Sequence, residues 1–263
     1  MVDYLTPLPA SRVAAWYRRL ADRFSRERID NQEPLAAVFL RQWLNNRDSN
    51  FTLTFNAPNY LKQSGYVVDV LKHQRKVFLT QEQARRGNLP PVWGGVIPRL
   101  QALPGFTPWS PPDPLSMTYE CLVEVGSNAI DIARIQLRGT PQEKDLFYSL
   151  RGFQLKSEVR VNGALLPTPI PSIQITFTSW SSRVIDKFDF NYNEYITVGN
   201  PDYQSTLADA IRPQDETIVV YHSNARRLEQ ANLACPYRIQ SNSWTVSDAN
   251  ITGPANVDPN QQL

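Results

Sequence analysis

The residues best suited to chemistry form a short cluster, Tyr221-His222-Ser223-Asn224. His222 follows an apolar run and precedes residues that can begin a helix, a position where catalytic side chains often lie. Its imidazole could act as a general base toward Ser223 or a more distant nucleophile. Neighbouring residues of a strand point to opposite faces, however, so the two side chains are poorly placed to pair. We favour the structural alternative, in which Ser223 or Asn224 caps the helix and His222 is hydrogen-bonded at a half-buried strand end.

Three carboxylates lie nearby in the sequence, Asp186, Asp189 and Glu194. Together they suggest the paired carboxylates of a glycosidase, and either aspartate could orient His222. A spacing of three residues in a strand places Asp186 and Asp189 on opposite faces, which weakens the pair. We therefore interpret both as solvated residues near a strand end and keep them, with His222, as weak catalytic candidates.

The sequence lacks the motifs of metal and cofactor chemistry. It contains two histidines and two cysteines, Cys121 and Cys235, and none of them has the spacing of zinc ligands. Gly94-Gly95 lacks the Gly-Lys-Ser/Thr ending of a phosphate loop. No dinucleotide-binding pattern and no Gly-x-Ser-x-Gly pattern occurs. We expect no metal and no cofactor, and interpret both cysteines as buried thiols.

Aromatic residues suggest a site that binds without reacting. Trp93 and Trp109 lie among prolines and could anchor an extended arm on a partner. Tyr192 and Tyr195 could belong to a stacking platform for sugars or bases. The other aromatic residues of that region are Trp180, Phe188, Phe190 and Tyr203. Because aromatic side chains also fill ordinary β cores, we favour a core role for the group.

The elements that must position these residues centre on Leu146–Phe190, where apolar and polar residues alternate. This alternation predicts three or four strands. Asn162-Gly163 predicts a tight type I′ turn between two of them. Met117–Val125 and Ile130–Leu137 predict a further hairpin. We expect these strands to form an antiparallel β sandwich or a barrel-like body.

Two amphipathic helices are predicted ahead of the strands. Apolar residues recur at helical spacing from Val13 to Phe24 and from Leu35 to Leu44, which predicts a helical hairpin. Tyr66–Leu71 and Lys76–Leu79 fit a strand or a helix equally well. Prolines punctuate Leu89–Pro114, where regular structure is not expected.

The predicted fold is therefore mainly β, of the α+β class, with four regions. Residues 1–88 form a helical or mixed N-terminal region, and residues 89–114 a proline-rich arm or linker. Residues 115–247 form the antiparallel β body, and residues 248–263 a polar C-terminal arm.

Charge and apolar runs limit the possible partners. The formal net charge is +2, which argues against a dedicated nucleic-acid binder. Tyr60–Leu100 is nevertheless basic, and the residues from Gln101 onward carry 12 basic against 17 acidic side chains. No signal peptide and no apolar run of about 20 residues is present. We expect a cytoplasmic protein, or one exported without a signal peptide or held within a particle.

These observations predict a function without catalysis. We expect a structural or assembly protein with protein partners, through self-association or within a larger assembly such as a virus-like or contractile-secretion-type particle. Two alternatives stay open. One is an enzyme or toxin-like effector with a site around His222, and the other is a carbohydrate- or peptide-binding β-sandwich module.

Overall fold

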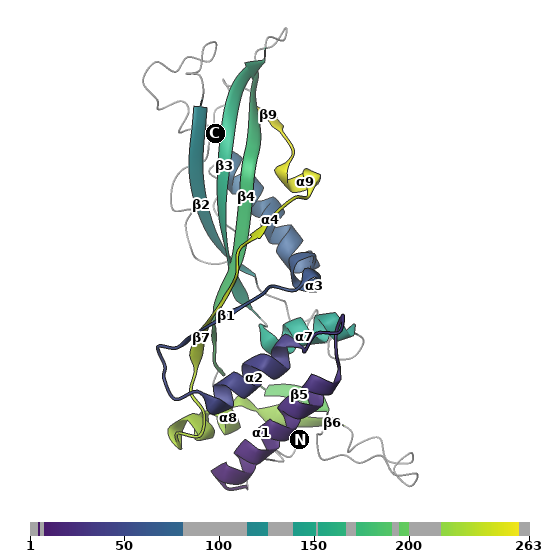
Figure 1. Cartoon of the computed structure of the whole chain (residues 1–263), viewed down its shortest axis with the longest axis vertical. Coiled ribbons are helices and arrows are strands. Elements are labelled where there is room, and N and C mark those ends of the chain that lie inside the picture. Colours follow the sequence, from purple (N-terminus) through teal and green to yellow (C-terminus); the bar gives the residue numbers. More distant parts are fainter. Residues whose placement is uncertain are drawn as a thin grey trace. The chain divides into compact units, whose positions relative to one another are not determined.

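The computed structural model describes Leu5 and residues 8–80, 115–125, 139–150, 152–166, 172–190, 195–199 and 217–257. These residues form a mixed α+β fold with a mostly antiparallel main sheet (Figure 1). The chain divides into two compact units, each made of three separate stretches of sequence. Unit 1 is Met1–Leu53, Ser127–Arg151 and Asp186–Ile239; unit 2 is Thr54–Gly126, Gly152–Ile185 and Gln240–Leu263.

Unit 1 begins with the predicted helical hairpin. Helix α1 (Ala10–Arg26) packs against helix α2 (Leu35–Asn45), whose C-terminal cap residue is Asn46. Between them, Asp30 and Asn31 adopt positive φ angles of 51° and 62°. These short polar residues tolerate the left-handed region better than most side chains, so the connection can turn sharply. The two predicted helices are confirmed.

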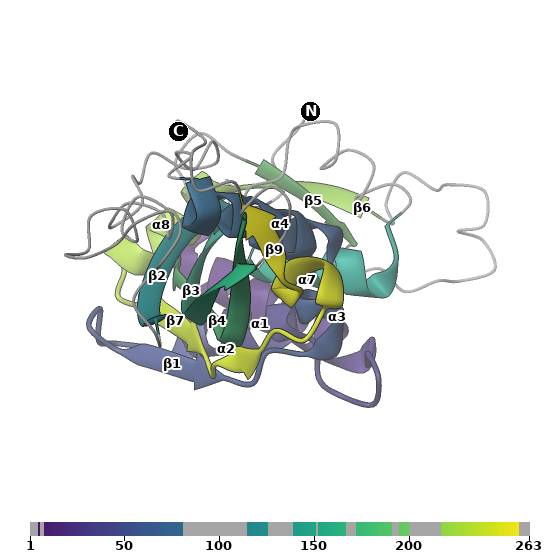
Figure 2. The same ribbon diagram turned by 90° about the horizontal axis from the view of Figure 1, so that it is seen from above.

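Two further helices and a small sheet complete unit 1. Helix α7 (Pro141–Ser149) begins with a capping box between Thr140 and Glu143, and helix α8 (His222–Gln230) follows strand β6 (Thr217–Tyr221) directly. Strand β6 pairs antiparallel with β5 (Tyr195–Gly199), and Figure 2 shows the two side by side. The apolar run that precedes His222 in the sequence is therefore strand β6.

Aromatic side chains fill the core of unit 1. The Trp43 ring lies 4.8 Å from that of Phe190 and 5.4 Å from that of Tyr17, measured between ring centroids. Phe188 makes similar contacts with Phe39 and Tyr237, at 5.9 and 5.7 Å. These separations and the tilted or edge-on geometries are those that aromatic quadrupoles favour. Phe188 and Phe190 are packed core residues, as favoured from the sequence for these two.

Unit 2 is built on three long antiparallel strands, β2 (Leu115–Val125), β3 (Phe153–Leu166) and β4 (Ser172–Phe188, whose last residues belong to unit 1). The complete strand order is β1-β7-β4-β3-β2. The additional strands are β1 (Thr52–Phe55), β7 (Tyr237–Ser241), β8 (Trp244–Thr245) and β9 (Ala255–Val257), and the last two pair with β4.

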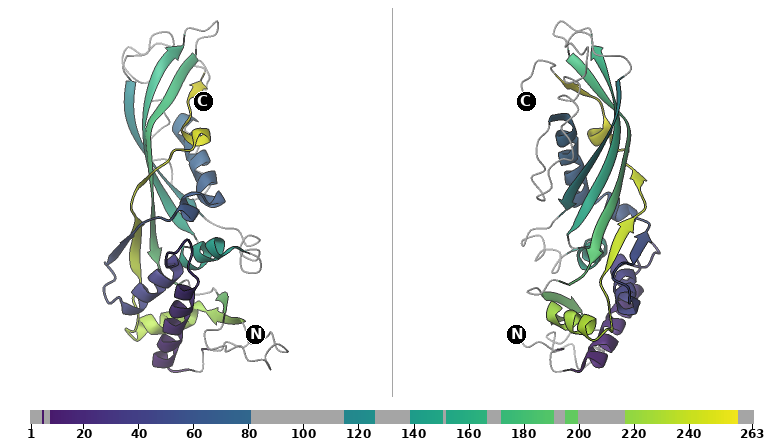
Figure 3. Two further views of the ribbon diagram at one scale, coloured as in Figure 1. Left: turned by 45° about the vertical axis from the view of Figure 1, so that its right-hand side comes forward. Right: turned by 90° about the vertical axis from the view of Figure 1, so that its left-hand side faces the viewer.

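One face of the unit 2 strands is buried. Alternate residues of β3, among them Leu155 and Val159, and residues of β4 such as Ile175 and Val184, are buried. Helix α4 (Gly65–Thr80) runs along the sheet, with the short helices α3 (Asn59–Lys62) and α9 (Ala249–Thr252) nearby (Figure 3). The segment Tyr66–Leu79, which fitted strand or helix equally well, is thus helical.

The turn predicted at Asn162-Gly163 is wrong. Strand β3 continues through both residues, with Asn162 opposite Thr176 of β4 and Gly163 opposite Ile175. Both residues also pair with β2 on the other side. Strand pairing on both sides of β3 outweighs the local preference of Asn-Gly for a turn, because each buried backbone group of a central strand needs a hydrogen-bond partner. The register shift occurs earlier, between Arg160 and Val161.

Three other expectations need correction. The strand pattern predicted from Leu146 begins only at Phe153, because the residues from Pro141 to Ser149 form helix α7. The apolar runs Ile173–Phe177 and Val184–Phe188 belong to the single strand β4. The barrel-like alternative is also wrong, because the described strands form an open sheet that ends at β1 and β2. The sandwich and the four region boundaries stay predictions.

Candidate functional site

The structure places His222 in the aromatic core of unit 1. Its side chain is only 6% exposed, and its ring packs edge-on against Phe190 with 5.1 Å between centroids. Helix α8 begins at His222 itself, with Tyr221 at the cap position. The expectation that Ser223 or Asn224 caps this helix is therefore wrong. Asn224 lies inside the helix, where its Oδ1 accepts a hydrogen bond from Arg227 at 3.0 Å.

The two aspartate candidates lie at the end of β4 and just beyond it. Asp186 is half-buried within the strand, and its neighbour Lys187 forms an ion pair with Asp189 at 3.1 Å. The Lys187 side chain is 59% exposed, so this pair contributes little to stability. The Asp189 side chain is 27% exposed, and the solvated role expected for it stays a prediction.

The aromatic candidates divide into two groups. Trp180, Phe188 and Phe190 are buried, so they offer no surface on which a sugar or base could stack. Tyr195 begins strand β5 opposite Tyr221, and its side chain is outside the described part. Trp93, Trp109, Tyr192 and Tyr203 also lie outside the described residues.

Neither a metal site nor a reactive thiol emerges from the described residues. In that part of the chain, no group of three or more His, Cys, Asp or Glu side chains could hold a metal ion. Cys235 is a half-buried thiol whose pKa is raised by burial and by the nearby Glu229 carboxylate. A raised pKa lowers the thiolate fraction, and with it the reactivity of the thiol. Cys121 lies on β2 opposite Ser157, its side chain outside the described part.

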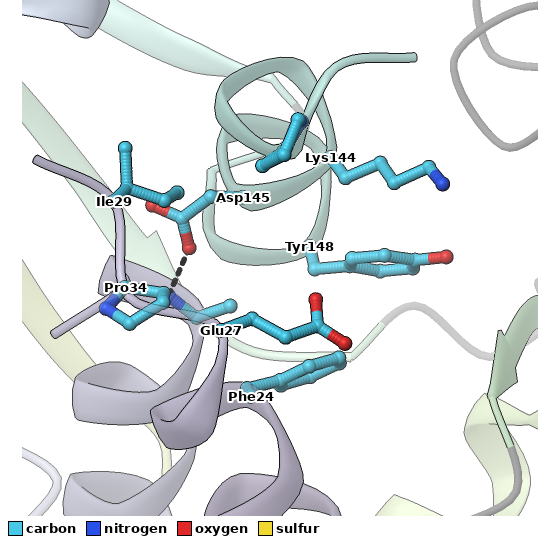
Figure 4. Close-up of a pocket in the computed structure, with 9 residues that line it drawn as sticks. Phe24, Glu27, Ile29, Pro34, Lys144, Asp145 and Tyr148 are labelled. Atoms are coloured by element: carbon cyan, nitrogen blue, oxygen red, sulfur yellow. Dashed lines mark hydrogen bonds between the residues drawn. The ribbon is translucent and has the colours of Figure 1, made fainter. Parts of the chain in front are cut away.

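A pocket in unit 1, which the sequence analysis missed, lies between α7 and the region where α1 leads into α2 (Figure 4). Its empty volume, including the part open to solvent, is about 330 Å³. The residues lining it come from α1, the connection, α2 and α7: Phe24, Glu27, Ile29, Pro34, Ala36, Pro141, Lys144, Asp145 and Tyr148.

Asp145 holds the two sides of the pocket together. Its carboxylate accepts hydrogen bonds from the backbone N–H groups of Leu35 at 3.0 Å and Ala36 at 2.8 Å. These are unsatisfied donors of the first turn of α2, whose cap residue Pro34 makes no side-chain hydrogen bond. A carboxylate at this end of a helix also interacts favourably with the helix dipole. Asp145 is therefore a structural residue of the pocket.

An aromatic wall closes one side of the pocket. The Phe24 and Tyr148 rings stack with 5.3 Å between centroids and an interplanar angle of 22°. Burial, and secondarily the Glu27 carboxylate, raise the pKa of Tyr148 to about 12, so its phenol stays protonated at neutral pH. In Figure 4 the Lys144 ammonium and the Tyr148 hydroxyl point the same way, away from the Asp145 carboxylate. The pocket thus combines an apolar wall, a neutral hydroxyl and three charged side chains, the basic Lys144 and the acidic Glu27 and Asp145.

One sequence signal for this site was available. Thr140 and Glu143, followed by Asp145 and Tyr148 at a spacing of three, fit a capped helix with two side chains on one face. The strand pattern predicted from Leu146 onward overlaps the second half of this helix. The contact of Asp145 with α2 has no sequence signal, because it joins residues 110 positions apart.

Known proteins provide no guide to this site. Comparison of the chain with models of protein families, with curated proteins and with solved structures finds no match. No helix in the described part combines the length and the apolar character needed to cross a membrane.

Proposed function

We propose that this chain is a non-enzymatic assembly protein that contacts protein partners, including other copies of itself, through extended segments. A component of a virus-like or contractile-secretion-type particle is one form of such a protein. The proposal rests chiefly on the contacts by which Arg75 holds the C-terminal segment, residues 248–257, on the sheet of unit 2.

Arg75 contacts three backbone carbonyl groups of that segment. Its Nη1 donates hydrogen bonds to the carbonyl oxygens of Ile251 and Gly253, the latter at 2.7 Å, and its Nη2 contacts that of Pro254 at 3.3 Å. The guanidinium lies 5.1 Å from the centroid of the Phe177 ring, within the range of a cation–π interaction. The planar donors of arginine suit such multiple contacts, which lysine does not reproduce.

Helix α4, which carries Arg75, is itself fixed to the sheet. Gln74 Nε2 donates to the carbonyl oxygen of Leu155 at 3.0 Å, and Ser157 Oγ donates to Gln74 Oε1 at 2.6 Å. Strand β9 also pairs with β4. Helix α4, ahead of the predicted arm of residues 89–114, is thus anchored on the sheet. The predicted arm of residues 248–263 is anchored on the same sheet through β9. A rigid base limits the conformational entropy that extended segments lose when they bind a partner.

The environment of the enzyme candidates supports the same proposal. His222 packs in an aromatic core, Asp189 pairs with an exposed lysine, and Asp145 caps a helix. A general base needs a position within reach of a substrate proton, which a core histidine does not offer. An effector centred on His222 is therefore the less favoured alternative.

The test is the mass of the purified chain in solution, measured by light scattering over a range of concentrations. We expect a discrete oligomer whose mass falls when Asp258–Leu263 is deleted or when Trp93 and Trp109 are both replaced by alanine. Arg75→Ala should weaken the oligomer, whereas Lys72→Ala, an exposed change on the same helix, should leave it intact. A monomer at high protein concentration would contradict the proposal.

A further inference from the structure

We propose that the pocket between α1, α2 and α7 binds the proline-rich segment Pro108–Pro114 of a second copy of the chain. This inference rests on the proposed assembly function and names the contact that would produce self-association.

The pocket wall has the chemistry that recognises proline. Flat aromatic faces in shallow grooves bind prolines of extended, polyproline II segments, which lose little entropy on binding. The stacked pair of Phe24 and Tyr148 provides such faces, and Pro34 and Pro141 extend the apolar lining. A protonated Tyr148 hydroxyl can also donate to one of the carbonyl groups that a polyproline II segment leaves exposed.

The chain itself carries a matching segment. Pro108, Pro111 and Pro114 are spaced by three residues. Polyproline II has three residues per turn, so in that conformation the three prolines lie on one face. Their spacing therefore fits docking on a single aromatic wall.

Charge complementarity fixes the direction of the segment. Pro104–Pro114 contains one charged residue, Asp113, and no basic residue. On the pocket, Lys144 is half-buried and Glu27 is exposed. The third charged side chain of the lining, Asp145, is buried and already accepts two hydrogen bonds from α2. Binding with Asp113 toward Lys144 pairs opposite charges, whereas the reverse direction brings Asp113 close to the Glu27 carboxylate. The two opposite charges thus select one orientation.

A second copy is the occupant that the chain itself provides. Each chain carries one pocket and one segment, so the two are present in equal numbers in any solution of the protein. The contact joins two different surfaces, which makes it heterologous. Such contacts close into a ring or continue as a filament, and both fit an assembly protein.

The direct test is binding of a labelled synthetic peptide, Pro104–Pro114, to the full chain by fluorescence anisotropy. The chain should carry Pro108, Pro111 and Pro114 replaced by alanine, so that its own segments do not compete. We expect saturable binding that weakens at least about tenfold with Tyr148→Ala, as for the loss of a central aromatic contact. A peptide with the same three alanines should not bind, and Glu158→Ala, an exposed change in unit 2, should leave binding unchanged.

A charge exchange keeps the test decisive if Tyr148→Ala disturbs folding. Lys144→Glu should weaken the normal peptide by about fivefold, the scale of an exposed ion pair. A peptide carrying Asp113→Lys should regain that loss on the Lys144→Glu chain. Absent peptide binding, or binding that neither pocket variant changes, would overturn the inference.

The light-scattering experiment separates this inference from the proposed function. An arm-dependent oligomer whose mass does not respond to Lys144→Glu would refute the pocket as the docking site and leave the assembly function standing. A monomer at high concentration would refute the assembly function and, with it, the second copy as occupant.

Discussion

Asp145 accepts a hydrogen bond at 3.0 Å from the backbone N–H of Leu35, a residue 110 positions earlier in the chain. Helix α2 starts after a proline that makes no side-chain hydrogen bond, so α7 supplies the cap that α2 lacks. The same contact sets the spacing between two walls of the pocket. Folding of unit 1 and the shape of its pocket therefore depend on one buried carboxylate.

Removing this carboxylate should destabilise the protein strongly. Asp145→Ala leaves two buried N–H groups without their acceptor, and we expect a loss of about 2–3 kcal/mol in the free energy of unfolding. Asp145→Asn should lose less, because its amide oxygen can still accept one hydrogen bond. Urea denaturation followed by circular dichroism measures both.

The control for that experiment is Glu158→Ala, which removes an exposed carboxylate and should change the free energy of unfolding by less than about 0.5 kcal/mol. Equal losses for Asp145→Ala and Glu158→Ala would contradict the capping role.

The raised pKa of Tyr148 makes stability depend on alkaline pH. The pKa is about 12 in the folded protein, against an ordinary value of 10.0, because burial disfavours the phenolate. Between those values the unfolded chain releases this proton and the folded protein keeps it, so stability falls as pH rises above 10. At pH 11 the free energy of unfolding is expected to be lower by about 1.4 kcal/mol, which corresponds to one pKa unit.

The variant Tyr148→Phe isolates this effect. It cannot ionise at this position, so its stability should fall less than that of the unchanged protein between pH 8 and pH 11. Burial also raises the pKa of Tyr237, and that contribution is common to both proteins. Parallel stability curves for the two proteins in urea would show that Tyr148 does not titrate as expected.

The buried polar cluster of unit 2 should behave as a coupled network. Gln74 and Ser157 are fully buried, and the Ser157 hydroxyl contacts both Gln74 and Ser182, at 2.6 and 2.7 Å. Ser157→Ala leaves the Gln74 side chain without one partner and should lose about 1–3 kcal/mol of stability. Gln74→Leu and the double variant complete a thermodynamic cycle. We expect the double variant to lose less than the two single losses together, and strict additivity would show that the contact carries no coupling.

Local patterns predicted the elements whose burial follows a regular period. The helices α1 and α2 are predicted correctly because their apolar residues repeat at helical spacing. Asn162-Gly163 failed as a turn because ladders on both sides hold the residues extended, a non-local effect. Helix α7 was missed because its apolar residues, such as Leu146 and Phe147, continue into the strand that follows.

The site was less predictable than the fold. The position of His222 between an apolar run and a helix start suggests a catalytic residue, yet its surroundings are aromatic and buried. The sequence does not predict the roles of Asp145 and Tyr148, because these roles depend on contacts with α1 and α2, more than 100 residues away. Residue type alone does not distinguish a helix cap from a catalytic acid. The difference lies in which backbone groups the carboxylate meets, and only the folded chain decides that.

The contact of Arg75 with the C-terminal segment should control how often that segment detaches. Arg75→Ala removes its hydrogen bonds to the carbonyl groups of Ile251 and Gly253, and we expect amide hydrogen exchange in β9 to accelerate about tenfold or more. Arg75→Lys should restore only part of the protection, because an ammonium lacks the planar set of donors. Lys72→Ala serves as the matched control on α4 and should not alter exchange. Unchanged protection of Ala255–Val257 in Arg75→Ala, measured by mass spectrometry, would mean that pairing with β4 alone holds the segment in place.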